Sequence, residues 1–221
     1  NLTGQLGITV SNCQQVKNAL DAVEMNVQPS DNYNPDAPIC AANYFTVPIF
    51  QDNMENGAGF WQITGTSQNA WSLTTGYASS ATNMLYGDDS YSSNDSSIRM
   101  TTGLALPVSS NMYLHFKHAF GFESYAGITY DGGVLEYTIN NGANWVDASS
   151  LFVDGQNYKG VISNYSGTTN ALMGRYAFVG DSHGYVSSRY NLTALGGQTV
   201  KFRWRFATDE SFSNLGWTVD D

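Results

Sequence analysis

The chain has 221 residues, enough for one large domain, and carries 9 basic against 19 acidic side chains, a net charge of −10. Such a surface repels phosphate backbones and anionic lipid, so we expect neither nucleic-acid binding nor membrane insertion. It attracts cations, and calcium is the usual one for scattered carboxylates. Charged residues make up 13% and aromatic residues 14%, which is typical of extracellular all-β proteins.

The first residues differ in pattern from all that follow. Ser11 and Gln14 have the spacing of a capping box, and apolar residues then recur at helical spacing. This pattern predicts one amphipathic helix over 13–25. The chain opens without Met or an apolar leader, so we expect a secreted, extracellular fragment cut from a longer precursor.

Residues 28–48 contain four of the five prolines and read as a connector. The chain has two cysteines, Cys13 in the predicted helix and Cys40 in this connector. An even cysteine count in an acidic, Asn- and Ser-rich chain predicts a Cys13–Cys40 disulfide in an oxidising compartment. Two free buried thiols are the alternative.

From Phe45 onward the pattern predicts strands, short and separated by long polar loops. The clearest are the apolar alternations within 108–122, 133–139 and 200–208, a turn at 140–142, and a last strand that begins at 216. A parallel α/β fold would need helices between these strands. The predicted fold is therefore mainly β, an antiparallel jelly-roll β-sandwich with one N-terminal α-helix.

The sequence does not contain the catalytic motifs that we considered. His115 and His118 lie three residues apart in a predicted strand, so they face opposite sides and do not chelate one ion together. The sequence contains no His-Glu-x-x-His and no Gly-x-Ser-x-Gly motif. Five glutamates are present, and no spacing selects a glycosidase pair from them. We expect no catalytic residue in this chain.

Acidic residues on expected loops suggest a calcium site. Asp52 and Glu55 flank the first expected strand, and Asp220 lies in the last. The first and last strands of a jelly roll commonly lie side by side, so these carboxylates are expected to converge on one ion. Asp89, in a loop rich in Gly, Ser and Tyr, is a fourth candidate ligand. Solvated acidic loops without an ion are the alternative.

The aromatic residues are expected to serve mostly as core. Each tryptophan falls in or beside a strand pattern, namely Trp61, Trp71, Trp145, Trp204 and Trp217. Tyrosines in loops are candidates to stack on sugars or peptides, although scattered surface tyrosines are the simpler interpretation: Tyr86, Tyr91, Tyr158, Tyr165 and Tyr185.

Two parts of the sequence resemble known families. Gly7-Ile8-Thr9, Cys13-Gln14-Gln15-Val16 and Ala22-Val23-Glu24-Met25 resemble the carboxy-terminal helix of secreted thermolysin-like (bacillolysin and fungalysin) zinc metallopeptidases. The resemblance implies that 1–27 is the end of a catalytic domain. Zinc would then be bound only upstream, outside this sequence.

The remainder is similar to the MAM-type and immune-inhibitor-like jelly-roll domains appended to such peptidases. Four motifs carry this resemblance in order, and they lie in 52–61, 104–118, 130–145 and 203–221. In that family a cation often lies between the opening acidic motif and the closing aspartate. This implies Asp52, Glu55 and Asp220 as its ligands here.

The prediction divides the chain into a peptidase helix at 1–27, a disulfide-tied linker at 28–48 and a sandwich at 49–221. We expect a non-catalytic accessory domain of a secreted zinc metalloendopeptidase, which aids docking or stability. Its expected partners are its own catalytic domain and a protein or glycan surface, and we expect a monomer. The alternative is a carbohydrate- or cell-surface-binding module of an adhesin or glycoside hydrolase. A hydrolase in its own right ranks last.

Overall fold

The structure is a computed structural model that describes residues 9–22, 36–65, 71–89, 91–108, 111–164 and 169–221. The chain divides into two compact units, residues 1–34 and 35–221. The described part of the first unit contains one helix, α1 (Val10–Ala22). Within the described ranges, no helix is long and apolar enough to cross a membrane.

Helix α1 confirms the predicted helix but begins three residues earlier, with a different cap. Thr9 Oγ1 accepts a hydrogen bond from Asn12 N at 3.1 Å, and Asn12 Oδ1 accepts one from Thr9 N at 2.8 Å. This reciprocal pair is a capping box, so Thr9 takes the position predicted for Ser11. The predicted helix end at 23–25 lies outside the described residues.

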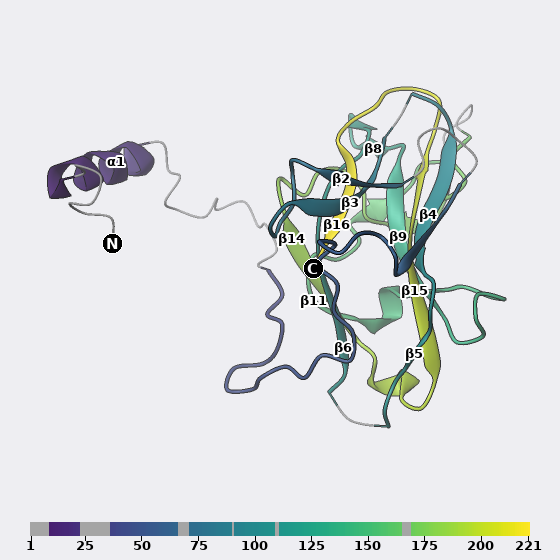
Figure 1. Cartoon of the computed structure of the whole chain (residues 1–221). Coiled ribbons are helices and arrows are strands. Elements are labelled where there is room, and N and C mark those ends of the chain that lie inside the picture. The colour runs from purple at the N-terminus through teal and green to yellow at the C-terminus, as the bar shows by residue number, and fades with distance from the viewer. Residues whose placement is uncertain (1–8, 23–35, 66–70, 90, 109–110, 165–168) are drawn as a thin grey trace. The chain divides into compact units, whose positions relative to one another are not determined.

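The second unit consists of two antiparallel sheets with two short hairpins beside them (Figure 1). Sheet A has the order β1 (Trp61–Thr64), β4 (Asn94–Met100), β15 (Thr199–Thr208), β9 (Gly132–Thr138), β10 (Val146–Asp147), and β5 (Leu104–Ala105) also pairs with β15. Sheet B has the order β11 (Phe152–Gly155), β14 (Val186–Asn191), β6 (Tyr113–Gly121), β16 (Gly216–Asp220), β3 (Asn83–Gly87), β2 (Ser72–Thr75). The hairpins are β12 (Gly160–Val161) with β13 (Tyr176–Ala177), and β7 (Ser124–Tyr125) with β8 (Ile128–Thr129).

The strand order is that of a jelly roll. Eight strands can be counted first to eighth along the chain: β3, β4, β6, β9, β10, β14, β15 and β16. With this numbering, the neighbouring strands in sheet B are 1-8-3-6 and those in sheet A are 2-7-4-5. The antiparallel jelly-roll β-sandwich is therefore confirmed.

The core lies between the two sheets and is largely aromatic. Sheet A contributes alternate residues of β15, including Trp204, and sheet B contributes alternate residues of β6, including Phe116. The rings of Phe116 and Trp204 meet edge to face with centroids 5.2 Å apart. Gly133 is required by this packing, since a Cβ there would lie 2.2 Å from Cζ3 of Trp217 in the facing sheet.

Two details differ from the sequence prediction. In the described residues, no strand occurs between Phe45 and β1. Strand β9 is buried on both faces instead of one, with Val134, Leu135 and Glu136 all at most 4% exposed. Its outer face is covered because Arg175, from the segment before β13, bonds to Glu136.

Part of the predicted linker binds the sandwich. Asp36 Oδ1 accepts a hydrogen bond from Ser187 N in β14 at 2.9 Å. Ala37 is 4% exposed, and its carbonyl bonds to the His115 ring at 3.0 Å. Residues 36 and 37 therefore extend the sandwich along sheet B, although the prediction placed them in a tether.

Candidate functional site

Four carboxylates from separate loops meet at one end of the sandwich. Asp89 follows β3, Glu123 follows β6, Asp131 precedes β9 and Asp209 follows β15. Sheet pairing brings these strand ends together, because Ala207 in β15 pairs with Gly132 in β9. Carboxylate oxygens of Glu123, Asp131 and Asp209 all lie within 4.8 Å of one another. We call these four residues the carboxylate cluster.

Two oxygens of the carboxylate cluster lack a hydrogen-bond partner although they are buried. Asp131 is 0% exposed; its Oδ1 accepts from Asp209 N at 2.7 Å, whereas its Oδ2 has no donor. Asp89 is 1% exposed; its Oδ2 accepts from Asn214 N at 3.1 Å, whereas its Oδ1 has no donor. A buried carboxylate oxygen without a donor is costly, so this arrangement calls for a proton or a cation.

Burial and like charge raise the pKa of these carboxyls. Burial, and then the Asp89 charge, raises the pKa of Asp131 to about 8. Burial, helped by the charges of Glu123 and Asp88, raises the pKa of Asp89 to about 6. Burial also raises the pKa of Glu123, with the Asp209 charge as a further cause. A bound cation would reverse these effects by compensating the negative charges.

The donor set fits a hard cation. Only carboxylate oxygens make up the group that lies within 4.8 Å. Calcium takes six to eight oxygen ligands in flexible geometry, whereas zinc favours nitrogen and sulfur. Calcium is therefore the ion that these residues suit best.

Three of the four predicted calcium ligands lie elsewhere and bind protein groups. Asp52 accepts from Trp61 Nε1 at 2.8 Å and from Met54 N at 3.0 Å. Glu55 accepts from the backbone N–H groups of residues 82 and 83, which lower its pKa. Asp220 accepts from the N–H groups of residues 79 and 80, at 2.8 Å each. Glu55 and Asp220 thus both bind the backbone of the loop that contains residues 79, 80, 82 and 83. A calcium ion at Asp52, Glu55 and Asp220 stays a prediction.

Asp89 is the predicted ligand that lies in the carboxylate cluster. Sequence reasoning missed its neighbours Glu123, Asp131 and Asp209 as ligands, although two of them fall within the motifs that suggested the family resemblance. A usable signal was their position, since each lies within two residues of a strand end. Whether such positions lie at the same end of a sandwich can be predicted only if the strand order is known.

The predicted Cys13–Cys40 disulfide stays a prediction. Cys40 is a free thiol in the structure, and its Sγ donates to Tyr44 O at 3.0 Å. The side chain of Cys13 lies outside the described residues.

A second candidate site is a hollow of about 240 Å³ on the outer face of sheet A. It is lined by polar and cationic side chains around one indole: Gln62, Arg99, Met100, Asn141, Gly142, Trp145 and Lys201. Trp145 was expected in the core, but it is only partly buried. The reason is that β10 starts one residue later and is two residues long, so Trp145 belongs to the β9–β10 loop. We call this site the Trp145 hollow.

Among the tyrosines suggested for stacking, Tyr158 is core, with 3% exposure. Tyr86 donates to Asp88 and to Leu215 O, at 2.9 Å each. Tyr165 lies outside the described residues. These contacts favour structural roles for Tyr86 and Tyr158.

A buried His–Ser pair lacks the geometry of a nucleophile and its base. His118 Nδ1 accepts from Trp217 Nε1 at 3.2 Å, so its other nitrogen carries the hydrogen and donates to Ser188 Oγ at 2.8 Å. Ser188 in turn donates to Gln156 O at 2.6 Å. Burial lowers the pKa of His118 to about 3, and both side chains are 0% exposed. The proton therefore points the wrong way for activating the serine, and no substrate reaches it.

Comparison with known proteins adds a distant similarity in fold. No family model matches the sequence, and no curated protein matches it. The chain is similar to a solved structure of TmCBM61 in complex with beta-1,4-galactotriose, with 12% identity and a TM-score of 0.41. That match covers 76% of this chain and 90% of the other. The resemblance to secreted metallopeptidases stays a prediction.

Proposed function

We propose that the chain is a non-catalytic glycan-binding module of a secreted protein. The observation that carries the proposal is the Trp145 hollow, which combines a partly buried indole with amide and cationic side chains on the outer face of sheet A. Sugar sites in proteins pair a flat aromatic surface with a few placed hydrogen-bonding groups. The His118–Ser188 geometry supports the non-catalytic part of the proposal.

Glycan binding is tested with purified protein on a glycan array, followed by calorimetry on the best ligand. The panel should include β-1,4-galactan, other neutral plant and microbial polysaccharides, and acidic ones. We expect saturable binding that Trp145→Ala weakens at least tenfold, while thermal unfolding shows that the variant is still folded. Wild-type protein that binds nothing on the panel would refute the function.

Calcium binding is a second role, favoured by the carboxylate cluster. An ion bridging Glu123, Asp131 and Asp209 would hold together loops that follow or precede three different strands. The free energy of unfolding then rises with calcium, by about 2.7 kcal/mol at one hundred times the dissociation constant.

The calcium test compares wild-type protein with Asp131→Asn, in EDTA and in millimolar CaCl₂ at pH 8. We expect calcium to raise the melting temperature of the wild type and to leave that of the variant unchanged. In EDTA the variant should be at least as stable as the wild type, because the amide removes a buried carboxyl whose pKa is raised. Asp95→Asn, an acidic residue outside the cluster, is the control. If calcium does not change the melting temperature of the wild type, the proposed calcium site is refuted.

A further inference from the structure

The outer face of sheet A gathers most of the positive charge of an acidic chain. Five of the nine lysines and arginines lie on it, although the net charge is −10. Three alternate along β15, one lies on β4 and one comes from the segment before β13: Lys201, Arg203, Arg205, Arg99 and Arg175. Such an accumulation is unfavourable unless something compensates it, because arginines directly opposite each other repel.

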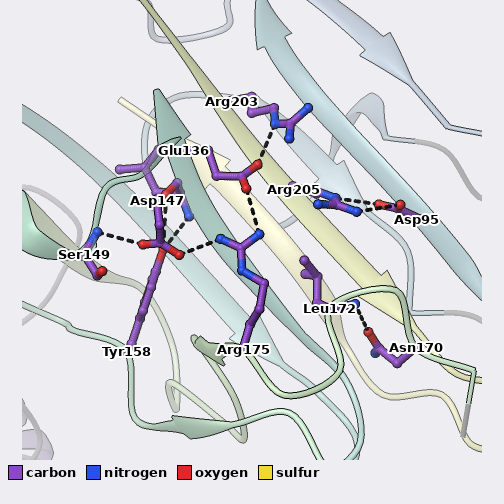
Figure 2. A network of polar contacts seen from close by, with 11 residues as sticks. Asp95, Glu136, Asp147, Ser149, Tyr158, Asn170, Leu172, Arg175, Arg203 and Arg205 are labelled. Carbon is purple, nitrogen blue, oxygen red and sulfur yellow. Dashed lines mark hydrogen bonds and ion pairs between the residues drawn. The ribbon is translucent and has the colours of Figure 1, made fainter. Parts of the chain in front are cut away.

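Carboxylates compensate three of these five cations (Figure 2). Glu136 accepts from Arg203 at 2.6 Å and from Arg175 at 2.7 Å, and Arg175 also pairs with Asp147. Arg205 makes two hydrogen bonds to Asp95, at 2.8 Å each. The Glu136 pairs lie on the side of β15 toward β9 and β10, and the Arg205–Asp95 pair joins β15 to β4.

The other two cations have no carboxylate partner among the residues that the structure describes. Arg99 donates twice to the neutral amide oxygen of Gln62, at 3.2 and 3.0 Å. Lys201 donates to the backbone carbonyl of Thr101 at 2.7 Å. Both side chains line the Trp145 hollow, whose lining contains no acidic residue. The positive charge left without an anion is therefore concentrated at the hollow.

Register places the groups of the hollow in a row. Gln62 pairs with Arg99 across β1 and β4, and Arg99 pairs with Arg203 across β4 and β15. The Arg203 guanidinium lies 4.4 Å from the Trp145 ring centroid, which fixes the indole beside the row. Gly142, which lies beside the indole, has φ +92, a left-handed backbone conformation that favours glycine.

We propose that the Trp145 hollow binds an anionic sugar unit, carboxylated or sulfated, within an acidic polysaccharide. The N–H groups of Arg99 that do not bond to Gln62 meet the anionic group together with the ammonium of Lys201, and the side chains of Gln62 and Asn141 bond to hydroxyls. The part of the Trp145 indole that Arg203 leaves exposed contacts the sugar ring. This inference rests on the proposed function and narrows its ligand class.

A pair of ligands with the same sugar and different charge tests the inference. Calorimetry in 50 mM NaCl compares pentagalacturonate with its methyl ester, in which the sugar is retained and the charge removed. A sulfated galactan oligosaccharide distinguishes sulfate from carboxylate, and a poly-Glu peptide tests whether any polyanion suffices. We expect one acidic sugar to bind at least tenfold more tightly than the neutral ester and the peptide.

Variants then locate the binding. Arg99→Gln should weaken binding of the acidic sugar by about ten- to a hundredfold, as expected for a hydrogen bond to a charged group. Lys117→Gln, which removes one positive charge from sheet B, should leave it unchanged. Melting temperatures confirm that both variants fold.

The outcomes separate this inference from the proposed function. Equal binding of acid and ester, undiminished in Arg99→Gln, would overturn the anionic specificity and leave glycan binding intact. Preference for the peptide, or equal losses in both variants, would also overturn it. Binding to no sugar at all would overturn both.

Discussion

The buried carboxylate of Glu136 gives the sharpest test of the energetics. It is 4% exposed and accepts hydrogen bonds from two arginines, as Figure 2 shows. The substitution Glu136→Gln keeps the shape of the side chain and removes its charge. Arg175 and Arg203 then face each other without the anion between them, and Arg203 still faces Arg99 across the sheet.

The expected cost follows from how well each partner is buried. Breaking a buried ion pair by removing one partner costs about 3–5 kcal/mol. The side chains of Arg175 and Arg203 retain 28% and 18% exposure, so solvent screens part of the loss and the low end applies. About 3 kcal/mol corresponds to a drop of roughly 6–12 °C in melting temperature for a chain of this size.

Guanidinium chloride unfolding followed by tryptophan fluorescence, at pH 7 and fixed calcium, measures this loss. Asp95→Asn is the matched control, because its pair with Arg205 has a carboxylate that is 41% exposed. The control should lose at most about 1 kcal/mol. A loss in Glu136→Gln below about 1 kcal/mol, or equal to that of the control, would refute the reasoning.

Three further predictions concern other parts of the sandwich. Burial lowers the pKa of His118 to about 3, so below pH 6.5 the unfolded chain binds a proton there that the folded chain does not, and His118 alone lowers stability by about 1.4 kcal/mol per pH unit as the pH falls. The raised pKa values of Asp131 and Asp89 act in the opposite direction in wild type and variant alike, so the measured quantity is the difference in slope between wild type and His118→Gln; equal slopes would contradict this. Gly133→Ala should lose at least about 2 kcal/mol because its Cβ overlaps Trp217, whereas Gly59→Ala, which meets no atom within 4 Å, should lose less than about 1 kcal/mol; denaturant midpoints compare them. Asp220→Ala should lose about 2 kcal/mol through the freed N–H groups of residues 79 and 80, equally with and without calcium; a selective loss of calcium affinity would instead support an ion at Asp52, Glu55 and Asp220.

The sequence predicted strands wherever one face is apolar and the other wet. Strands β6 and β15 keep that contrast, with residues such as Phe116 and Trp204 inside and Lys117 and Arg203 outside. The burial of both faces of β9 was not predictable, because Arg175 reaches Glu136 from 39 residues away.

The carboxylate cluster could not be predicted from the sequence for a related reason. Asp131 and Asp209 are 78 residues apart and meet only because Ala207 pairs with Gly132. A shift of one residue in that register would turn alternate side chains to the opposite face. Asp52, Glu55 and Asp220 have the same composition signal, yet backbone N–H groups or an indole N–H already bind them. Composition therefore does not distinguish an acidic residue that bonds to protein N–H groups from one that binds an ion.

The central place of β16 has a consequence for how the protein is made. This strand lies between β6 and β3, and its partner residues Gly216 and Gly121 are about 95 residues apart, roughly 5–20 s of synthesis. During that interval β3 and β6 exist with unpaired edges toward each other, and such edges invite aggregation. We therefore expect sheet B to complete its strand pairing late in folding. Nascent chains that lack β16 should then depend on chaperones or on delayed collapse.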